Sequence, residues 1–476
     1  MGTTSRIAPG GIFQDTDFDF SARIALGMVA SGVSDVGVVL ATLDQVTDGD
    51  AQSWFDAWST RGAALAKQGD AALAGGHLRS ARWAYLAASA AYAKAQDAVD
   101  GLADQSVLGP TFAAHRKHWD AWIDASEGRH VRVEIPYEGT TLPGYLLRPD
   151  ATGVARPTLV VTNGSDGSLN DMYGSGAAEA LARGWNAFLY DGPGQQSLVF
   201  DRGVPFRPDW EAVLTPVIDA LVARPDVDSD ALTGYGISQA GYWLPRALAF
   251  EHRLVAAVAD PGVVDASTSW TGFLPPPMLQ LLHGGMKTEF NAFMAQAGGD
   301  PAAERTFAFR SRPYGIDDPY DLFTEVGKYQ LRDVAGQIRT PLLITDPQDE
   351  QFWPGQSRQL FDLLPGDKEI VEFTRTEGAN FHCEPMGRVL THLRMLTGWR
   401  ISWRSGADHR LGRLVPSLRT ATAPNPAAVD RHAWTRAGCR AGMTHPGHPA
   451  LPARDWPLRT APFRHRFPGP RRRRRL

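Results

Sequence analysis

Ser238 stands in a short Gly-rich segment whose residue types could turn a serine hydroxyl into a nucleophile. The segment Gly236-Ile-Ser-Gln-Ala240 follows a mainly apolar run and precedes a helix-like stretch that reaches Phe250. Small residues two positions before and after a serine let a strand and a helix approach closely, so the turn can hold the serine in a strained, exposed conformation. A match this short is weak by itself, because many serines in Gly-rich turns only cap a helix.

Two segments downstream supply an acid and an imidazole in the order serine, acid, histidine. The first, from Thr340 to Pro354, is expected to be a buried strand that ends in an acidic loop. The second places His382 after a strand expected over residues 369–374 and before a helix-like stretch. A serine hydroxyl needs an imidazole to accept its proton, and the imidazole needs a carboxylate that fixes its tautomer and stabilises its cation. We therefore predict His382 as the base.

Three aspartates compete for the role of that carboxylate. Asp346 comes directly at a strand end before a proline, which is typical of a turn residue. Asp260 ends a strand-like run over residues 254–259. Asp349 lies deeper in its loop, where a side chain can reach across to His382. We favour Asp349, and the predicted triad is Ser238, Asp349 and His382.

Backbone N–H groups are expected to stabilise the oxyanion that attack on a carbonyl would produce. One donor is predicted at Gln239, directly after the nucleophile, and the other in the loop after the strand 158–162. This loop reads Asn163-Gly-Ser-Asp-Gly167, and its glycines permit close backbone approach. Gly164 and Ser165 are the candidates, with Ser165 preferred, although the loop could also be an ordinary Gly/Asn/Asp turn.

The periodicity of the chain predicts which elements position these residues. Ala-rich helical patterns fill about residues 20–124, a period-two hairpin follows at 130–147, and strands then alternate with helices from residue 158. Such alternation predicts a mainly parallel sheet with helices on both faces. The expected division is an N-terminal helical domain (1–128), a core in two parts (129–261 and 336–398), an inserted lid (262–335) and a basic tail (399–476).

The charge of the chain is unevenly divided. The formal net charge is -4, but residues 401–476 hold 16 Arg and 3 Asp with no Lys or Glu, a net +13, which leaves -17 on the first 400 residues. An acidic body argues against nucleic acid as its partner. The tail could be a basic arm for nucleic acid or anionic lipid. Its composition fits better with a GC-rich gene translated out of frame, so we expect a disordered and non-native end.

Composition and cysteine usage limit the remaining possibilities. A chain of 476 residues with 43% hydrophobic residues is globular and long enough for several units. The presence of only two cysteines argues against a disulfide framework, and we expect a cytoplasmic protein. No signal peptide or membrane-spanning stretch is evident, and no cofactor or metal site is expected.

Together these motifs resemble a branch of the α/β-hydrolases that carries a helical domain ahead of its core. The branch includes 2,6-dihydroxypseudooxynicotine hydrolase and fungal hydrolases that shorten polyketide pigment precursors. The resemblance covers about residues 15–398 and includes Asp191-Gly-Pro-Gly and Glu377-Gly-Ala. Ala240 and Gln196 stand where relatives often have Gly. The resemblance implies hydrolysis of an ester, or of a carbon–carbon bond next to a ketone, in a small aromatic or polyketide-like molecule. It also implies that the protein could form a homodimer.

Other functions share the same triad order. Acylaminoacyl and dipeptidyl peptidases usually carry a large propeller, whereas this N-terminal region is predicted to be helical. An acyltransferase or cyclase would use the same serine with a second nucleophile in place of water. A catalytically inactive binding protein would leave Ser238 unreactive toward a phosphonate probe.

Overall fold

Apolar runs in the second quarter of the chain and beyond assemble into one eight-stranded sheet. The structure is a computed structural model that describes residues 11–296 and 299–398. The strand order is β1-β2-β4-β3-β5-β6-β7-β8, in which β2 runs antiparallel to both neighbours and the pairs from β4 to β8 are parallel. The predicted α/β class with a mainly parallel sheet is therefore confirmed. The strands are β1 (His130–Tyr137), β2 (Thr140–Leu147), β3 (Arg156–Thr162), β4 (Asn186–Tyr190), β5 (Val227–Ile237), β6 (Ala256–Asp260), β7 (Leu342–Pro347) and β8 (Lys368–Phe373).

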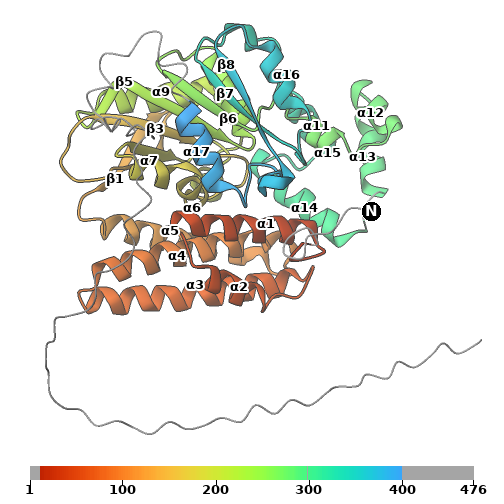
Figure 1. Cartoon of the computed structure of the whole chain (residues 1–476). Coiled ribbons are helices and arrows are strands. Elements are labelled where there is room, and N and C mark those ends of the chain that lie inside the picture. The colour runs from red at the N-terminus through yellow and green to blue at the C-terminus, as the bar shows by residue number, and fades with distance from the viewer. Residues whose placement is uncertain (1–10, 297–298, 399–476) are drawn as a thin grey trace, which may run out of the picture. The chain divides into compact units, whose positions relative to one another are not determined.

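Helices pack against both faces of this sheet (Figure 1). One apolar core joins α9, α10 and α16 to the sheet, and a second joins α5, α7 and α17 to its other face. The central strands β3, β4 and β6 are buried along almost their whole length, as parallel strands covered on both faces must be. The helices of this part are α6 (Leu169–Met172), α7 (Ala178–Ala182), α8 (Gln196–Phe200), α9 (Glu211–Val222), α10 (Ala240–Leu248), α16 (Gln356–Leu363) and α17 (Arg388–Gly398).

Five helices precede the sheet and lie together beside α6 and α17 in Figure 1. They are α1 (Thr16–Gly27), α2 (Val36–Leu43), α3 (Ala51–Ala74), α4 (Leu78–Gln96) and α5 (Leu108–Asp124). The first three begin at aspartates whose carboxylates accept backbone N–H bonds, the usual N-cap arrangement. The long helices α3 and α4 pack closely because Tyr85 and Tyr92 lie against Gly69 and Gly62, where a β-carbon would collide with the ring.

The segment between β6 and β7 contains five further helices. They are α11 (Thr268–Thr271), α12 (Pro276–His283), α13 (Lys287–Gln296), α14 (Pro301–Ser311) and α15 (Pro319–Val326). Helix α14 reaches the N-terminal helices through polar contacts: Arg305 pairs with Asp15 at 2.8 Å, and Thr306 donates to Asp17 at 2.5 Å. The role of this segment as a lid remains a prediction.

The helical segment between β3 and β4 is interrupted. A π-helical turn at Tyr173–Ala177 separates α6 from α7. Gly174 lies here so close to Met28 that a β-carbon would overlap the Met28 sulfur, so tertiary packing accounts for the interruption of the helix.

Among the residues that the structure describes, no helix is long and apolar enough to cross a bilayer. The basic tail predicted at 399–476 lies outside the described residues.

Candidate active site

Ser238 occupies the turn between the end of β5 and the start of α10. Its φ of +57° is left-handed, a conformation that costs a non-glycine residue about 1–3 kcal/mol unless the surroundings enforce it. Two neighbours permit the turn: a β-carbon on Gly236 would overlap the carbonyl oxygen of Ala240, and one on Gly241 would overlap the Pro261 carbonyl. The close approach thus depends on positions 236 and 241, which explains why alanine is tolerated at 240.

The side chain of His382 links Ser238 to a carboxylate. His382 Nε2 lies 2.9 Å from Ser238 Oγ, and on the other side of the ring Nδ1 lies 2.9 Å from both carboxylate oxygens of Glu350. Ser238 follows β5, Glu350 follows β7 and His382 follows β8. The three side chains therefore meet at the carboxyl edge of the parallel strands. The imidazole and the carboxylate are nearly fully buried, with side-chain exposures of 4% and 5%.

The expectation that Asp349 contacts His382 is wrong. Its carboxylate binds the Arg375 guanidinium at 2.7 Å and accepts from Asn380 Nδ2 at 2.6 Å. Asp349 forms a bridge with Phe381, and neighbouring residues of an extended segment point to opposite sides. Glu350 is therefore the residue that turns toward the histidine.

The two other aspartates also lie away from the imidazole. Asp346 faces Arg358 at 3.7 Å. Asp260 is fully buried and accepts hydrogen bonds from Tyr235 at 2.5 Å and from Thr345 at 2.7 Å. Glu350 was not among the predicted acids, although glutamate is an accepted third member of such triads. The sequence signal for Glu350 was its position directly after Asp349, in the same acidic loop.

Glu350 is held as a carboxylate although it is buried. Burial alone would raise its pKa, but the charge of His382, its hydrogen bond and the backbone N–H groups of Phe352 and Trp353 lower the pKa below the ordinary value. Those N–H groups donate to Oε1 over 2.9 and 3.1 Å. A carboxylate oriented by the backbone in this way can fix the tautomer of the imidazole.

The loop after β3 lies directly against the serine. A β-carbon on Gly164 would sit 2.7 Å from the Ser238 β-carbon, so only glycine leaves room there. The Gly164 N–H donates to Asn163 Oδ1 over 2.8 Å and is already engaged. Within residues 11–296 and 299–398, the backbone N–H groups of Ser165 and Gln239 donate to no other protein group. Of the three predicted oxyanion donors, these two keep a free N–H.

A buried ionic cluster lies behind the serine. Arg388 is 1% exposed and lies 3.4 Å from Asp260 and 3.5 Å from Glu384, both fully buried carboxylates. Burial first, and then the charge of Asp260, raises the pKa of Glu384 well above its ordinary value. The backbone carbonyl of Asp260 accepts from Ser238 N–H at 2.6 Å and from the Cys383 thiol at 3.2 Å. The cluster therefore connects the nucleophile turn to the histidine loop.

Aromatic rings surround the imidazole. Ring centroids of Phe352, Trp353 and Phe20 lie 4.7, 5.6 and 6.2 Å from that of His382. Phe20 belongs to α1, more than 200 residues before the serine, so the N-terminal helices contribute to the site wall. No sequence pattern distinguished Phe20 from the other aromatic residues of this region.

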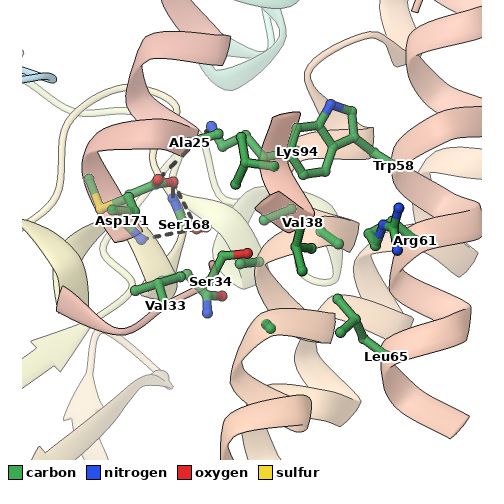
Figure 2. Close-up of a pocket in the computed structure, with 17 residues that line it drawn as sticks. Ala25, Val33, Ser34, Val38, Trp58, Arg61, Leu65, Lys94, Ser168 and Asp171 are labelled. Atoms are coloured by element: carbon green, nitrogen blue, oxygen red, sulfur yellow. Dashed lines mark hydrogen bonds and ion pairs between the residues drawn. The ribbon is translucent and has the colours of Figure 1, made fainter. Parts of the chain in front are cut away.

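A largely apolar cavity lies among α2, α3 and α4. Figure 2 shows Trp58 and Leu65 on one side of it, with Ser168, the N-cap of α6, and Asp171 of α6 on the other. A second cavity shares Ser168 and Asp171 with it and extends to Ser165. Within the described residues, no group of three His, Cys, Asp or Glu is placed to hold a metal ion.

The chain is similar to known proteins in sequence and in fold. No family model matches the chain. Hydrolase LUC6 from Fusarium sp is 30% identical over 404 residues, which cover 81% of this chain and 96% of LUC6. The 20-hydroxy-prefusarin hydrolase FUS2 from Gibberella moniliformis is 27% identical over 362 residues, 72% of this chain and 84% of FUS2. The solved structure of 2,6-dihydroxy-pseudo-oxynicotine hydrolase superposes with a TM-score of 0.62 at 18% identity, covering 78% of this chain and 94% of that one.

The chain belongs to the family of α/β-hydrolases that includes the fungal hydrolase LUC6. It is an enzyme with the α/β-hydrolase fold, and the resemblance stated from its motifs is confirmed.

Proposed function

We propose that this enzyme is a serine hydrolase in which Ser238 is the nucleophile, His382 the base and Glu350 the residue that orients the base. The observation that carries the proposal is the continuous chain of contacts from Ser238 Oγ through both ring nitrogens of His382 to Glu350, each at 2.9 Å. The separation matches that of a nucleophile and base within hydrogen-bond reach.

The proposed cycle begins when His382 Nε2 accepts the hydroxyl proton as Ser238 Oγ attacks a substrate carbonyl. Glu350, already hydrogen-bonded to Nδ1–H, stabilises the imidazolium that forms. The negative charge on the former carbonyl oxygen is assigned to the N–H groups of Ser165 and Gln239. The imidazolium then protonates the leaving group, and water activated by the same histidine releases the acyl group from Ser238.

We propose that the bond cleaved is an ester, or a carbon–carbon bond next to a ketone, in a small hydrophobic substrate. Either reaction requires attack on a carbonyl, and they differ in whether His382 protonates an alkoxide or a stabilised carbanion. The rings of Phe20, Phe352 and Trp353 support an apolar or aromatic substrate. Family membership supports the same class, since FUS2 is named for hydrolysis of 20-hydroxy-prefusarin.

The test is labelling with a fluorophosphonate probe, followed by peptide mapping and a panel of aryl esters and aryl β-diketones. Labelling on Ser238, hydrolysis of one substrate class and the loss of both in Ser238→Ala and His382→Ala are expected. Cleavage of aminoacyl anilides in preference to esters would favour a peptidase, and products formed with added alcohols or amines would favour acyl transfer. An unlabelled Ser238 with no turnover on any of these would overturn the proposal.

A further inference from the structure

Three arginines lie on α14 and the turn that follows it, and they differ in their partners. Arg305 pairs with Asp15 at 2.8 Å, and Arg312 pairs with Asp100. Arg310 lies between them in the sequence and forms no ion pair with a carboxylate in the described part of the chain. The N-terminal helices and their connections therefore neutralise two of the three cations and leave the third without a counter-charge.

The Arg310 side chain is oriented by α11. Its two terminal nitrogens donate to the Ser269 backbone carbonyl at 3.3 Å and to Ser269 Oγ at 2.9 Å, and its guanidinium carbon lies 4.8 Å from the centre of the Trp270 ring. These partners are neutral, so they fix the guanidinium without cancelling its charge. The Nε–H group makes no hydrogen bond within the described residues and is not fully enclosed, so a ligand can contact it.

One aromatic ring connects Arg310 to the proposed base. The Arg310 guanidinium carbon lies 6.0 Å from the centre of the Phe352 ring, and that ring lies 4.7 Å from the His382 imidazole. The guanidinium carbon is therefore no farther from the imidazole than the sum of these two distances. An aromatic acyl group attacked by Ser238 can span this separation, with Phe352 beside it.

A second ring leads from Arg310 to the other side of the serine. The Trp270 ring that Arg310 contacts lies 5.6 Å from the ring of Tyr314. The Tyr314 hydroxyl accepts a hydrogen bond from Gln239 Nε2 at 3.4 Å, and Gln239 directly follows Ser238. The two rings that flank Arg310 thus lead to both reacting groups of the proposed site.

The charge of Arg310 is desolvated and is not compensated by the protein. Burial lowers the pKa of its guanidinium below the ordinary value, and the opposing effects of Tyr314, Asp166 and Asp17 do not restore it. The charge of His382 in turn lowers the pKa of Asp166, so Asp166 lies within electrostatic range of both the imidazole and Arg310. A cation that has lost water without gaining a counter-charge is costly, and a substrate anion would offset that cost.

We propose that Arg310 binds a carboxylate of the substrate and thereby selects acyl groups that carry a negative charge at their far end. The inference rests on the hydrolase function proposed above and adds to it the charged end of the substrate. Arginine suits this role because its planar N–H groups donate charge-assisted hydrogen bonds to both oxygens of a carboxylate. The apolar body of the acyl group would then lie against Phe352, between Ser238 and Arg310.

A matched series of 4-nitrophenyl arylacetates tests this selection. The ring carries a carboxylate, the nearly isosteric carboxamide or an aminomethyl group, each at the meta or the para position, so that the charge changes while the size stays similar. At neutral pH and in the better of the two positions, kcat/KM for the carboxylate ester is expected to exceed that for the carboxamide about ten-fold. The aminomethyl ester should fall below the carboxamide by a similar factor, because two cations would face each other.

Variants then assign the preference to Arg310. Arg310→Gln should bring the carboxylate-to-carboxamide ratio to about one while kcat/KM for the carboxamide ester changes less than about three-fold. Arg310→Lys keeps the charge without the planar fork, so it should retain part of the preference. Arg332→Gln is the matched control, since it removes one positive charge from an exposed arginine whose side chain contacts Gln359, and it should leave the ratio unchanged.

The ratio also separates substrate binding from a purely structural role. If Arg310 only packs on Trp270, Arg310→Gln would lower kcat/KM for all the esters together and leave their ratios as in the wild type. Circular dichroism verifies the folding of each variant. Equal kcat/KM for the carboxylate and carboxamide esters at both positions, or a ratio that Arg310→Gln does not change, would overturn the assignment.

A binding measurement separates this inference from the proposed function. Ser238→Ala is titrated calorimetrically with the same esters, with and without Arg310→Gln, which measures affinity without turnover. If the wild-type enzyme hydrolyses none of them but Ser238→Ala binds the carboxylate ester more tightly and Arg310→Gln abolishes that preference, the proposed function falls and the assignment of Arg310 stands. Hydrolysis without any preference for the carboxylate, in rate or in affinity, would leave the function standing and overturn the assignment.

Discussion

Replacing Glu350 by glutamine tests the assignment of the acid most sharply. The substitution keeps the shape of the side chain and removes the negative charge that faces His382 Nδ1 at 2.9 Å. Two unit charges about 4 Å apart interact by roughly 4 kcal/mol at an effective dielectric constant near 20. Loss of this stabilisation of the imidazolium corresponds to a fall in kcat of about 10³-fold. If the imidazole also adopts the wrong tautomer, the fall in kcat would approach 10⁴-fold.

Asp349→Asn is the matched control, since it changes the adjacent acid by the same chemistry. Its carboxylate pairs with Arg375, whose side chain is 69% exposed, and exposed pairs of this kind contribute about 0–1 kcal/mol to stability. We expect kcat to change less than about three-fold.

Both variants are assayed by aryl ester hydrolysis under saturating substrate and by the rate of fluorophosphonate labelling. The labelling rate measures activation of Ser238 without the later deacylation step. A severe Asp349→Asn variant beside a mild Glu350→Gln variant would refute the assignment and restore the one expected from the sequence.

Three further predictions concern stability. Glu384→Gln should lower the unfolding free energy by less than about 1 kcal/mol, because the raised pKa of Glu384 favours the neutral form that glutamine resembles. Arg388→Met should lower it by about 3–5 kcal/mol, because the buried Asp260 carboxylate loses its cation; urea unfolding measures both. Because the pKa of Glu350 is lower in the folded state than its ordinary 4.5, its stabilising contribution is present above pH 4.5 and is lost as the pH falls through the folded value. The difference in unfolding free energy between wild type and Glu350→Gln should therefore shrink as the pH falls below 4.5, and a difference that stays constant there would contradict the prediction. Gly241→Ala should lower the melting temperature by the equivalent of about 1–3 kcal/mol, because the added methyl group would overlap the Pro261 carbonyl. Alanine favours helices, so without this overlap the substitution would stabilise α10, and a raised melting temperature in calorimetry would contradict the packing.

The part of the site that could be predicted from the sequence is the part that depends on strand ends. Ser238 and His382 each follow a strand of a parallel sheet, so their convergence follows from topology. The choice between Asp349 and Glu350 depends on which side of an extended bridge each residue faces, and a one-residue difference reverses that side. No periodicity in a loop fixes this direction.

Long-range packing accounts for what the sequence could not supply. Phe20 reaches the site because α1 packs near the loop after β7, where its ring lies 6.0 Å from that of Phe352. Arg388 contacts Asp260 across 128 positions of chain. Neither residue carries a local pattern that differs from an ordinary core aromatic or a surface arginine, so only the assembled fold reveals its position.

The carbonyl oxygen of Asp260 is shared by the backbone of the serine turn and the thiol next to the histidine. Both reactive segments are thus tethered to one atom at the end of β6, a strand whose residues are all buried. A displacement of this strand end would therefore move the nucleophile turn and the histidine loop together, which preserves the alignment on which the proposed proton transfer depends.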